Sequence, residues 1–188
     1  MDLVLFGIQG SGKGTQAKKL AAEFDFDMFE TGGELRAIAA SDTDLGRTVK
    51  SFIDKGHLAP LEIVMQVVKE AILARPKDTR ILFDGIPRNH EQMESFNEIM
   101  SDVGRQFRCI ELTVDAEQAL KRIQLRAAEQ GREDDANEET IRRRMQLFIE
   151  KTKPVIDAYK AQDIMTEVDG EGSVDEVYER MKAAVQAM

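Results

Sequence analysis

The sequence predicts an α/β fold of three layers, in which helices cover both faces of a mostly parallel, five-stranded sheet. Five short apolar segments have the composition of buried strands, and helical patterns of apolar residues lie between them. A glycine-rich turn joins the first strand directly to the first helix. This alternation favours parallel pairing, because each helix can carry the chain back across one face of the sheet.

The strands are predicted from short apolar runs that end at turn-forming residues. The first run, residues 3–6, reads Leu-Val-Leu-Phe and stops at a glycine. A run this short, rich in strand-forming residues, favours a buried strand over a helix. The remaining strands are expected at residues 26–29, 81–83, 109–114 and 164–168.

Helices are predicted where apolar residues recur with a period of 3.6. After Gly12, the residues Ala17, Leu20, Ala21 and Phe24 follow the spacing i, i+3, i+4 and i+7, which places them on one helix face. Further helices are expected at residues 34–41, 45–55, 61–74, 91–103, 116–127, 138–161 and 174–187.

The length of 188 residues suits one compact domain, and 42% hydrophobic residues suffice for its core. We therefore expect residues 1–188 to form a single domain. Two stretches do not fit simple crossovers: residues 30–59 contain two short helices, and residues 122–135 are dense in charge. Both are expected to be insertions at the ligand end of the sheet. The core is assigned to residues 1–29, 60–121 and 136–188.

Composition excludes several classes of protein. A formal net charge of -9 argues against a general nucleic-acid binder, which needs clustered basic residues. Cys109 is the only cysteine, so neither an intramolecular disulfide nor a multi-cysteine zinc site can form. Residues 1–6 lack the features of a secretory signal, and no apolar run approaches the roughly 20 residues of a membrane span. We expect a cytoplasmic protein without zinc, membrane or nucleic-acid partners.

The turn after the first strand carries a phosphate-binding motif. Residues 7–15 read Gly-Ile-Gln-Gly-Ser-Gly-Lys-Gly-Thr, which has the frame G-x-x-x-x-G-K of a Walker A loop. Glycines let the backbone wrap a phosphate, and the helix that follows directs its N-terminal N–H groups at the anion. Lys13 is expected to reach the β and γ phosphates, and Thr15 to contact phosphate or metal. The motif predicts nucleotide binding but does not define the reaction.

Four segments that follow one another along the chain carry information about the reaction. They read Gly-Ser-Gly-Lys-Gly-Thr-Gln at 10–16, Thr-Gly-Gly-Glu-Leu-Arg at 31–36, Asp-Gly-Ile-Pro-Arg at 84–88 and Arg-Glu-Asp-Asp-Ala-Asn at 132–137, with Arg144 downstream. This series resembles the motifs of the adenylate kinase family in its short-lid form, over nearly the whole chain. The resemblance implies a P-loop NTPase fold with an NMP-binding segment at 30–59 and a short lid at 122–135. It also implies reversible, Mg²⁺-dependent phosphoryl transfer between ATP and AMP.

The resemblance assigns the phosphate-binding loop and one end of the lid to ATP. Arg122 resembles the residue that stacks on the ATP adenine. Asp84 follows a predicted strand, where an acidic residue can hold Mg²⁺ through water together with Thr15. The implied ATP-binding residues are Gly10, Ser11, Gly12, Lys13, Gly14, Thr15, Arg122, Arg126 and Gly172.

The resemblance assigns a second set of residues to AMP. Arg36 and Arg88 are expected to hold its phosphate, since guanidinium forks match phosphate oxygens. Gln92 is expected to read the Watson–Crick edge of adenine, because its amide has both a donor and an acceptor. Thr31 resembles the residue that favours adenine over pyrimidines. The implied AMP-binding residues are Thr31, Gly32, Arg36, His57, Leu58, Ala59, Gly85, Arg88, Gln92, Arg132 and Arg144.

The implied chemistry needs no covalent intermediate. Transfer to a phosphate oxygen that is already ionised depends mainly on positioning and on charge stabilisation. The residues expected to stabilise the transferring phosphoryl group, and hence the implied catalytic residues, are Lys13, Arg88, Arg126, Arg132 and Arg144.

Departures from the family pattern leave two alternatives open. Gly33 stands where the family has the aspartate of Thr-Gly-Asp, which favours a non-catalytic nucleotide-binding protein on the same fold. Asn89 follows Arg88, as in many UMP/CMP kinases, although Thr31 and Gln92 argue against a pyrimidine acceptor. The expected partners are small nucleotides, and a monomer is expected.

Overall fold

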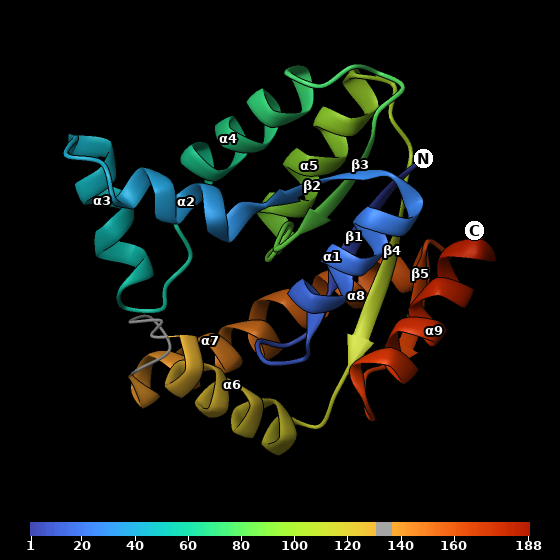
Figure 1. The fold of residues 1–188 in the computed structure, drawn as a ribbon. Coiled ribbons are helices and arrows are strands. Elements are labelled where there is room, and N and C mark those ends of the chain that lie inside the picture. The colour runs from blue at the N-terminus through green and yellow to red at the C-terminus, as the bar shows by residue number, and fades with distance from the viewer. Residues whose placement is uncertain (131–136) are drawn as a thin grey trace.

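The computed structural model describes residues 1–130 and 137–188, and the side chains of residues 126–130 are left undescribed. Its five strands all pair in parallel in the order β2-β3-β1-β4-β5, which confirms the predicted fold class (Figure 1). The strands are β1 (Asp2–Phe6), β2 (Phe26–Glu30), β3 (Arg80–Asp84), β4 (Phe107–Thr113) and β5 (Met165–Asp169).

Helices follow the strands in the predicted alternation. Within the described ranges, no helix has the length and apolar character needed to cross a membrane. The helices are α1 (Lys13–Phe24), α2 (Thr31–Ala39), α3 (Asp44–Ile53), α4 (Leu61–Leu73), α5 (His90–Asp102), α6 (Ala116–Gln130), α7 (Glu138–Leu147), α8 (Lys153–Ala161) and α9 (Val174–Gln186).

The two faces of the sheet bury different sets of side chains. Val4 and Phe83 face the apolar side chains of α4, α5 and α8, whereas Leu5 and Leu82 face those of α1 and α9. Successive residues of a strand point to opposite faces, so each buried strand contributes to both cores. The result is the predicted three-layer arrangement.

The central strand β1 fixes where a ligand can bind. All five of its residues are buried, and it pairs with β3 on one side and with β4 on the other. The chain therefore leaves β1 for one half of the sheet and later returns to build the other half. In open α/β sheets, ligands bind beyond the carboxyl ends of the strands at such a switch point. The glycine-rich loop after β1 lies at this point.

The model differs from the predicted helices at three places. Helix α2 begins at Thr31, directly after β2, although Gly32 and Gly33 disfavour a helix. Helix α6 extends to Gln130. The single helix predicted at 138–161 is divided into α7 and α8 by a π-helical segment, Phe148–Thr152. Pro154 lies at the start of α8 and lacks the N–H that regular helical bonding requires.

Candidate active site

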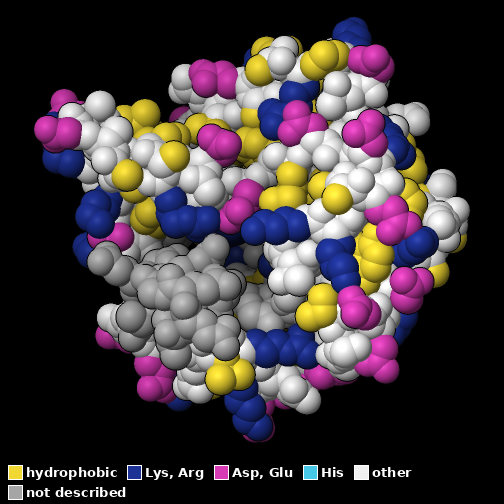
Figure 2. All heavy atoms as spheres, in the orientation of Figure 1, with side chains coloured by type: hydrophobic (Ala, Val, Ile, Leu, Met, Phe, Trp, Pro, Cys, Tyr) yellow, Lys and Arg dark blue, Asp and Glu magenta, His cyan; other side chains and the backbone are white. Residues whose placement is uncertain are grey.

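A cavity of about 1300 Å³ opens beyond the carboxyl ends of the strands. It is larger than the roughly 300–1,000 Å³ of usual small-molecule sites, so it has room for more than one small ligand. Lys and Arg side chains gather in the centre of the face shown in Figure 2. This local positive charge contrasts with the overall charge of -9 and suits an anionic ligand.

The loop between β1 and α1 forms one side of this cavity. Gly10 and Gly12 have backbone φ angles of 84° and 96°, which residues with a side chain rarely adopt. A Cβ on Gly10 would lie 2.2 Å from the carbonyl oxygen of Ala119 on α6, so a glycine is required there. The loop thus packs tightly against α6 and presents the N-terminus of α1 to the cavity, where backbone N–H groups attract an anion.

Lys13 and Asp84 face each other beside this loop. The Lys13 Nζ lies 3.9 Å from Oδ1 of Asp84, the last residue of β3. A Cβ on Gly14 would lie 4.0 Å from Oδ2 of the same carboxylate. Thr15 also lines the cavity. The oxygen donors predicted for a metal, on Thr15 and Asp84, therefore border the same loop.

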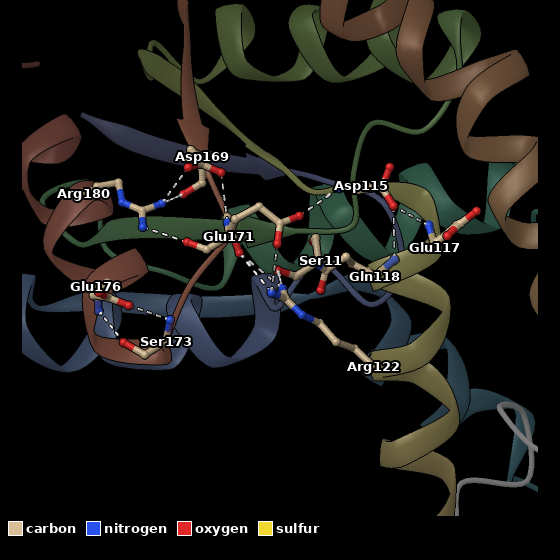
Figure 3. A network of polar contacts seen from close by, with 11 residues as sticks. Ser11, Asp115, Glu117, Gln118, Arg122, Asp169, Glu171, Ser173, Glu176 and Arg180 are labelled. Atoms are coloured by element: carbon tan, nitrogen blue, oxygen red, sulfur yellow. Dashed lines mark hydrogen bonds and ion pairs between the residues drawn. The ribbon is translucent and has the colours of Figure 1, made fainter.

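Arg122 spans the gap between the glycine-rich loop and the loop after β5 (Figure 3). Its guanidinium donates to the carbonyl oxygens of Ser11 and Gly170, each at 3.3 Å, and lies 3.8 Å from the Glu171 carboxylate. Arg180 of α9 holds the same loop by donating to the carbonyl oxygen of Glu171 at 2.7 Å. Arg122 and Arg180 therefore hold the loop after β5, which contains Gly172 and forms one wall of the cavity.

Arg88 lines the same cavity and is held by three hydrogen bonds. Its backbone N–H donates to Gln92 Oε1, its Nε donates to the carbonyl oxygen of Gly85, and its own carbonyl accepts from Thr152 Oγ1, each at 2.8 Å. Gly85 has a φ of 89°, and a Cβ there would lie 2.7 Å from Arg88 Nη2. The glycine therefore makes room for the guanidinium.

Arg88 keeps its positive charge although burial and two neighbouring arginines disfavour it. Burial lowers the pKa of its guanidinium, and Arg144 and Arg36 lower it further, whereas Asp84 and Glu30 oppose them. An arginine nonetheless stays protonated in proteins. Three arginines thus direct positive charge at one part of the cavity, which favours a group with more than one negative charge.

Arg36 and Arg144 reach this region from separate helices. Arg36 Nη2 lies 2.7 Å from Glu30 Oε1, and Arg144 Nη2 donates to the carbonyl oxygen of Ile53 at 3.3 Å. The second contact joins α7 to the end of α3. Both arginines act electrostatically on Arg88, so side chains from distant parts of the sequence lie near it.

Two buried hydroxyl groups point to a polar ligand. Ser11 Oγ and Thr31 Oγ1 have no hydrogen-bond partner among the described residues, and both residues are only 2% exposed. Both residues line the cavity. Because buried polar atoms are almost always hydrogen-bonded, these two are available to a bound molecule.

The model brings every described site residue of the sequence prediction to one cavity. Arg132 lies outside the described residues, and the side chain of Arg126 is not described. The predicted residues that line the cavity are Gly10, Ser11, Gly12, Lys13, Gly14, Thr15, Thr31, Gly32, Arg36, His57, Leu58, Ala59, Asp84, Gly85, Arg88, Gln92, Arg122, Arg144 and Gly172.

Sequence reasoning missed three residues of this site. Glu30 binds Arg36, Thr152 binds the backbone of Arg88, and Gln16 Nε2 donates to the carbonyl oxygen of Val174 at 2.9 Å. Two of these contacts join segments 64 and 158 residues apart in the chain. A local motif carries no signal for such contacts.

Known proteins resemble this chain over nearly its whole length. The family model described as adenylate kinase matches residues 5–164. An adenylate kinase of Thermus thermophilus is 38% identical over 184 residues, which is 97% of this chain and 96% of the relative. An adenylate kinase of Maricaulis maris is 38% identical over 187 residues, covering 99% of both chains. One from Phocaeicola vulgatus is 33% identical over 189 residues and 100% of both chains.

Proposed function

The chain belongs to the adenylate kinase family, and on that basis we propose that it reversibly transfers the γ-phosphoryl group of ATP to AMP with Mg²⁺. One observation carries the proposal. The phosphate-binding loop and the three arginines Arg36, Arg88 and Arg144 line a single cavity. A donor phosphate on the loop and an acceptor phosphate on the arginines can therefore lie close together, as in-line transfer requires.

The donor half holds ATP through the loop after β1. Its N–H groups and Lys13 bind the phosphates, and the adenine lies toward Arg122 and the loop that contains Gly172. Arg122 already contacts the carbonyl oxygen of Gly170 at 3.3 Å, so its planar guanidinium borders this part of the cavity. A planar cation suits stacking on an aromatic base.

The residues beside the donor phosphates fit Mg²⁺. Asp84 offers a carboxylate at the end of a buried strand, and Thr15 offers a hydroxyl at the start of α1. Mg²⁺ prefers oxygen ligands, keeps several waters and is usually held by one or two carboxylates together with substrate phosphates. When bound, the ion neutralises charge that develops on the transferring phosphoryl group.

The acceptor half selects AMP through Gln92 and Thr31. Gln92 Oε1 accepts the backbone N–H of Arg88, which orients the amide. An amide oxygen has two lone pairs, so both halves of the amide stay available to the base. The Nε2 donor then matches N1 of adenine, an acceptor, and the oxygen matches its N6 amino donor, whereas guanine presents an N1–H donor and an O6 acceptor in these places. AMP is therefore preferred over GMP.

The structure weakens the case for a pyrimidine acceptor. Asn89 was the feature that favoured a UMP/CMP kinase, and it is the N-cap residue of α5, whose side chain accepts the backbone N–H of Gln92 at 2.8 Å. Asparagine is among the preferred residues at this position for structural reasons alone. Its presence is therefore explained without any contact with a pyrimidine.

Catalysis rests on positioning and charge. The phosphate oxygen of AMP is already ionised at neutral pH, so no side chain needs to remove a proton from it. Lys13 and Arg88 both line the cavity, where they stabilise charge on the donor and acceptor sides of the transfer. Hydrolysis of ATP is limited when the acceptor fills the space that water would otherwise occupy.

A coupled assay with ATP, Mg²⁺ and AMP tests the proposal. We expect ADP formation that depends on AMP, with UMP, CMP and GMP as weaker acceptors. Lys13→Ala removes most turnover, whereas Lys69→Ala, an exposed lysine of α4, leaves it intact. Absence of ADP formation alongside measurable ATP binding would support the non-catalytic alternative. A faster rate with UMP or CMP would support the pyrimidine alternative.

A further inference from the structure

Glu30 occupies the part of the cavity where the acceptor phosphate is proposed to bind. It is the last residue of β2, and it lies beside Asp84 in the register of the sheet. Its carboxylate Oε1 lies 2.7 Å from Nη2 of Arg36 on α2. Both residues line the cavity. One of the two arginines predicted to bind the AMP phosphate is thus already paired with an anion of the protein.

The two glycines at the start of α2 lie beside this pair, and Gly32 makes room for it. A Cβ on Gly32 would lie 3.1 Å from Arg36 Nη1, and a Cβ on Gly33 would lie 3.7 Å from the Glu30 carboxylate carbon and from its Oε2. An aspartate at position 33 would therefore place a second carboxylate against that of Glu30. Gly33 is thus compatible with Glu30 and need not indicate loss of function.

Glu30 belongs to the group of charged side chains that surrounds Arg88. Burial lowers the pKa of Arg88, Arg144 and Arg36 lower it further, and Asp84 and Glu30 raise it, so Glu30 and Arg36 both act on Arg88. Without a ligand, the arginines repel each other, and Glu30 offsets part of that repulsion. A phosphate dianion would offset it in the same way. The carboxylate of Glu30 and the acceptor phosphate therefore compete for one cationic cluster.

We propose that Glu30 is a positioning residue that competes with the acceptor phosphate for Arg36. It holds Arg36 over the first turn of α2, and AMP must draw Arg36 away from it to bind. Glu30 thereby lowers the affinity for AMP and keeps the arginine in place between turnovers. This inference rests on the proposed function, because it assumes that Arg36 binds the phosphate of AMP.

The substitution Glu30→Gln tests this competition. Glutamine keeps the size of the side chain and an oxygen that can accept from Arg36, but it removes the negative charge. We expect the Kd for AMP, measured by isothermal titration without ATP, to fall by about three- to tenfold. The KM for AMP should fall in parallel, whereas the KM for ATP stays the same. Higher salt should reduce the difference, since it screens exposed charges.

Glu34→Gln is the matched control. Glu34 lies in the first turn of the same helix, is exposed and is absent from the cavity lining. Its substitution changes the net charge and the helix-terminal charge by the same amount as Glu30→Gln. We expect the Kd for AMP to remain within about twofold of that of the unmodified protein, because an exposed charge outside the site contributes little.

A double-mutant cycle with Arg36→Ala tests whether Glu30 acts through Arg36. In the Arg36→Ala background, Glu30→Gln should have a much smaller effect on the Kd for AMP. The inference is overturned by weaker or unchanged AMP binding in Glu30→Gln, by an equal effect of Glu34→Gln, or by an undiminished effect without Arg36. Failure of the unmodified protein to bind AMP would instead overturn the proposed function.

Discussion

The donor half and the acceptor half of the cavity differ in whether backbone or side chains form them. The donor half is mostly backbone: a glycine-rich loop after β1 and the N-terminus of α1, packed tightly against the Ala119 carbonyl of α6. The acceptor half is mostly side chains: Arg36, Arg88 and Arg144 reach one region from three separate segments. A backbone loop has its shape before a ligand arrives, whereas long side chains must be held by neighbours.

This difference determines how each half should respond to change. In the donor half, geometry depends on a few glycines with positive φ, so a single methyl group can disrupt it. In the acceptor half, geometry depends on hydrogen bonds and ion pairs between distant segments, and each of these contributes a modest amount. Substitutions should therefore be graded according to whether they remove a charge at the reacting group, deform the loop, or loosen a support.

The largest effect is expected for Arg88→Ala. It removes the most constrained charge of the acceptor half, and loss of one group that stabilises developing charge costs about 100- to 1,000-fold in kcat. We expect a loss of at least this size in steady-state ADP formation at saturating substrates. The far-ultraviolet circular dichroism spectrum should be unchanged.

Arg143→Ala is the control for this prediction, because Arg143 is exposed and does not line the cavity. It should retain full activity. If Arg88→Ala kept more than a tenth of the kcat, the acceptor half would not depend on this side chain.

The substitution Gly10→Ala should have the next largest effect. Its Cβ would lie 2.2 Å from the Ala119 carbonyl oxygen, and the backbone φ of 84° disfavours a side chain, so the loop must shift. A displacement of about 1 Å can cost about 100-fold in rate. We expect kcat/KM for ATP to fall by about that factor, with AMP binding by titration retained.

Gly104→Ala is the matched control for the loop. Gly104 has a φ of 68°, but nothing lies within 4 Å of a Cβ placed there. The substitution should lower the melting temperature slightly and leave kcat/KM unchanged. Equal activity losses in the two variants would show that backbone strain alone, and not contact with α6, explains the effect at Gly10.

A smaller effect is expected for Thr152→Val, which removes a support of the acceptor half. The valine has nearly the same shape but cannot donate to the Arg88 carbonyl oxygen, a bond of 2.8 Å in a buried setting. Loss of one hydrogen bond corresponds to roughly tenfold or less. We expect kcat/KM for AMP to fall by about three- to tenfold, with the KM for ATP unchanged.

Thr48→Val provides the comparison, since Thr48 donates to the Asp44 carbonyl oxygen at 2.9 Å on the exposed side of α3. Its kinetic constants should match those of the unmodified protein. A rise in the KM for ATP in Thr152→Val, with AMP unaffected, would contradict the assignment of Thr152 to the acceptor half.

The sequence predicts the donor half better than the acceptor half. The loop at 7–15 is a local motif whose composition follows from the backbone shape that it must adopt, so it could be identified without a fold. The arginines 36, 88 and 144 are implied only by the resemblance, and in the structure all three line one cavity.

The supports of these arginines could not be predicted. Thr152 acts through a contact with a residue 64 positions away in the chain, and Glu30 meets Arg36 because α2 begins directly after β2. The start of α2 at Thr31 could not be predicted either, because the two glycines that follow it disfavour a helix. Gly33 is an example. It lacks the carboxylate of the family's aspartate, but the structure places the carboxylate of Glu30 beside it.

The smallest effect is expected for Arg180→Ala, a substitution beside the donor half. Arg180 does not line the cavity, yet it contacts the carbonyl oxygens of Asp169 and Glu171 and the Asp169 carboxylate at 3.2 Å. Together with Arg122, it is a side-chain support within a half that is built mostly of backbone. We expect the KM for ATP to rise by about two- to fivefold, with kcat and the KM for AMP unchanged.

Lys182→Ala is the control for Arg180→Ala, since Lys182 lies on the same helix but pairs with Glu23 of α1, away from this loop. It should leave the KM for ATP unaltered. An effect of Arg180→Ala as large as that of Gly10→Ala would mean that the donor half relies on side-chain supports as much as the acceptor half. A KM for ATP within error of the unmodified value would mean that the loop after β5 holds its shape through Arg122 and its own backbone.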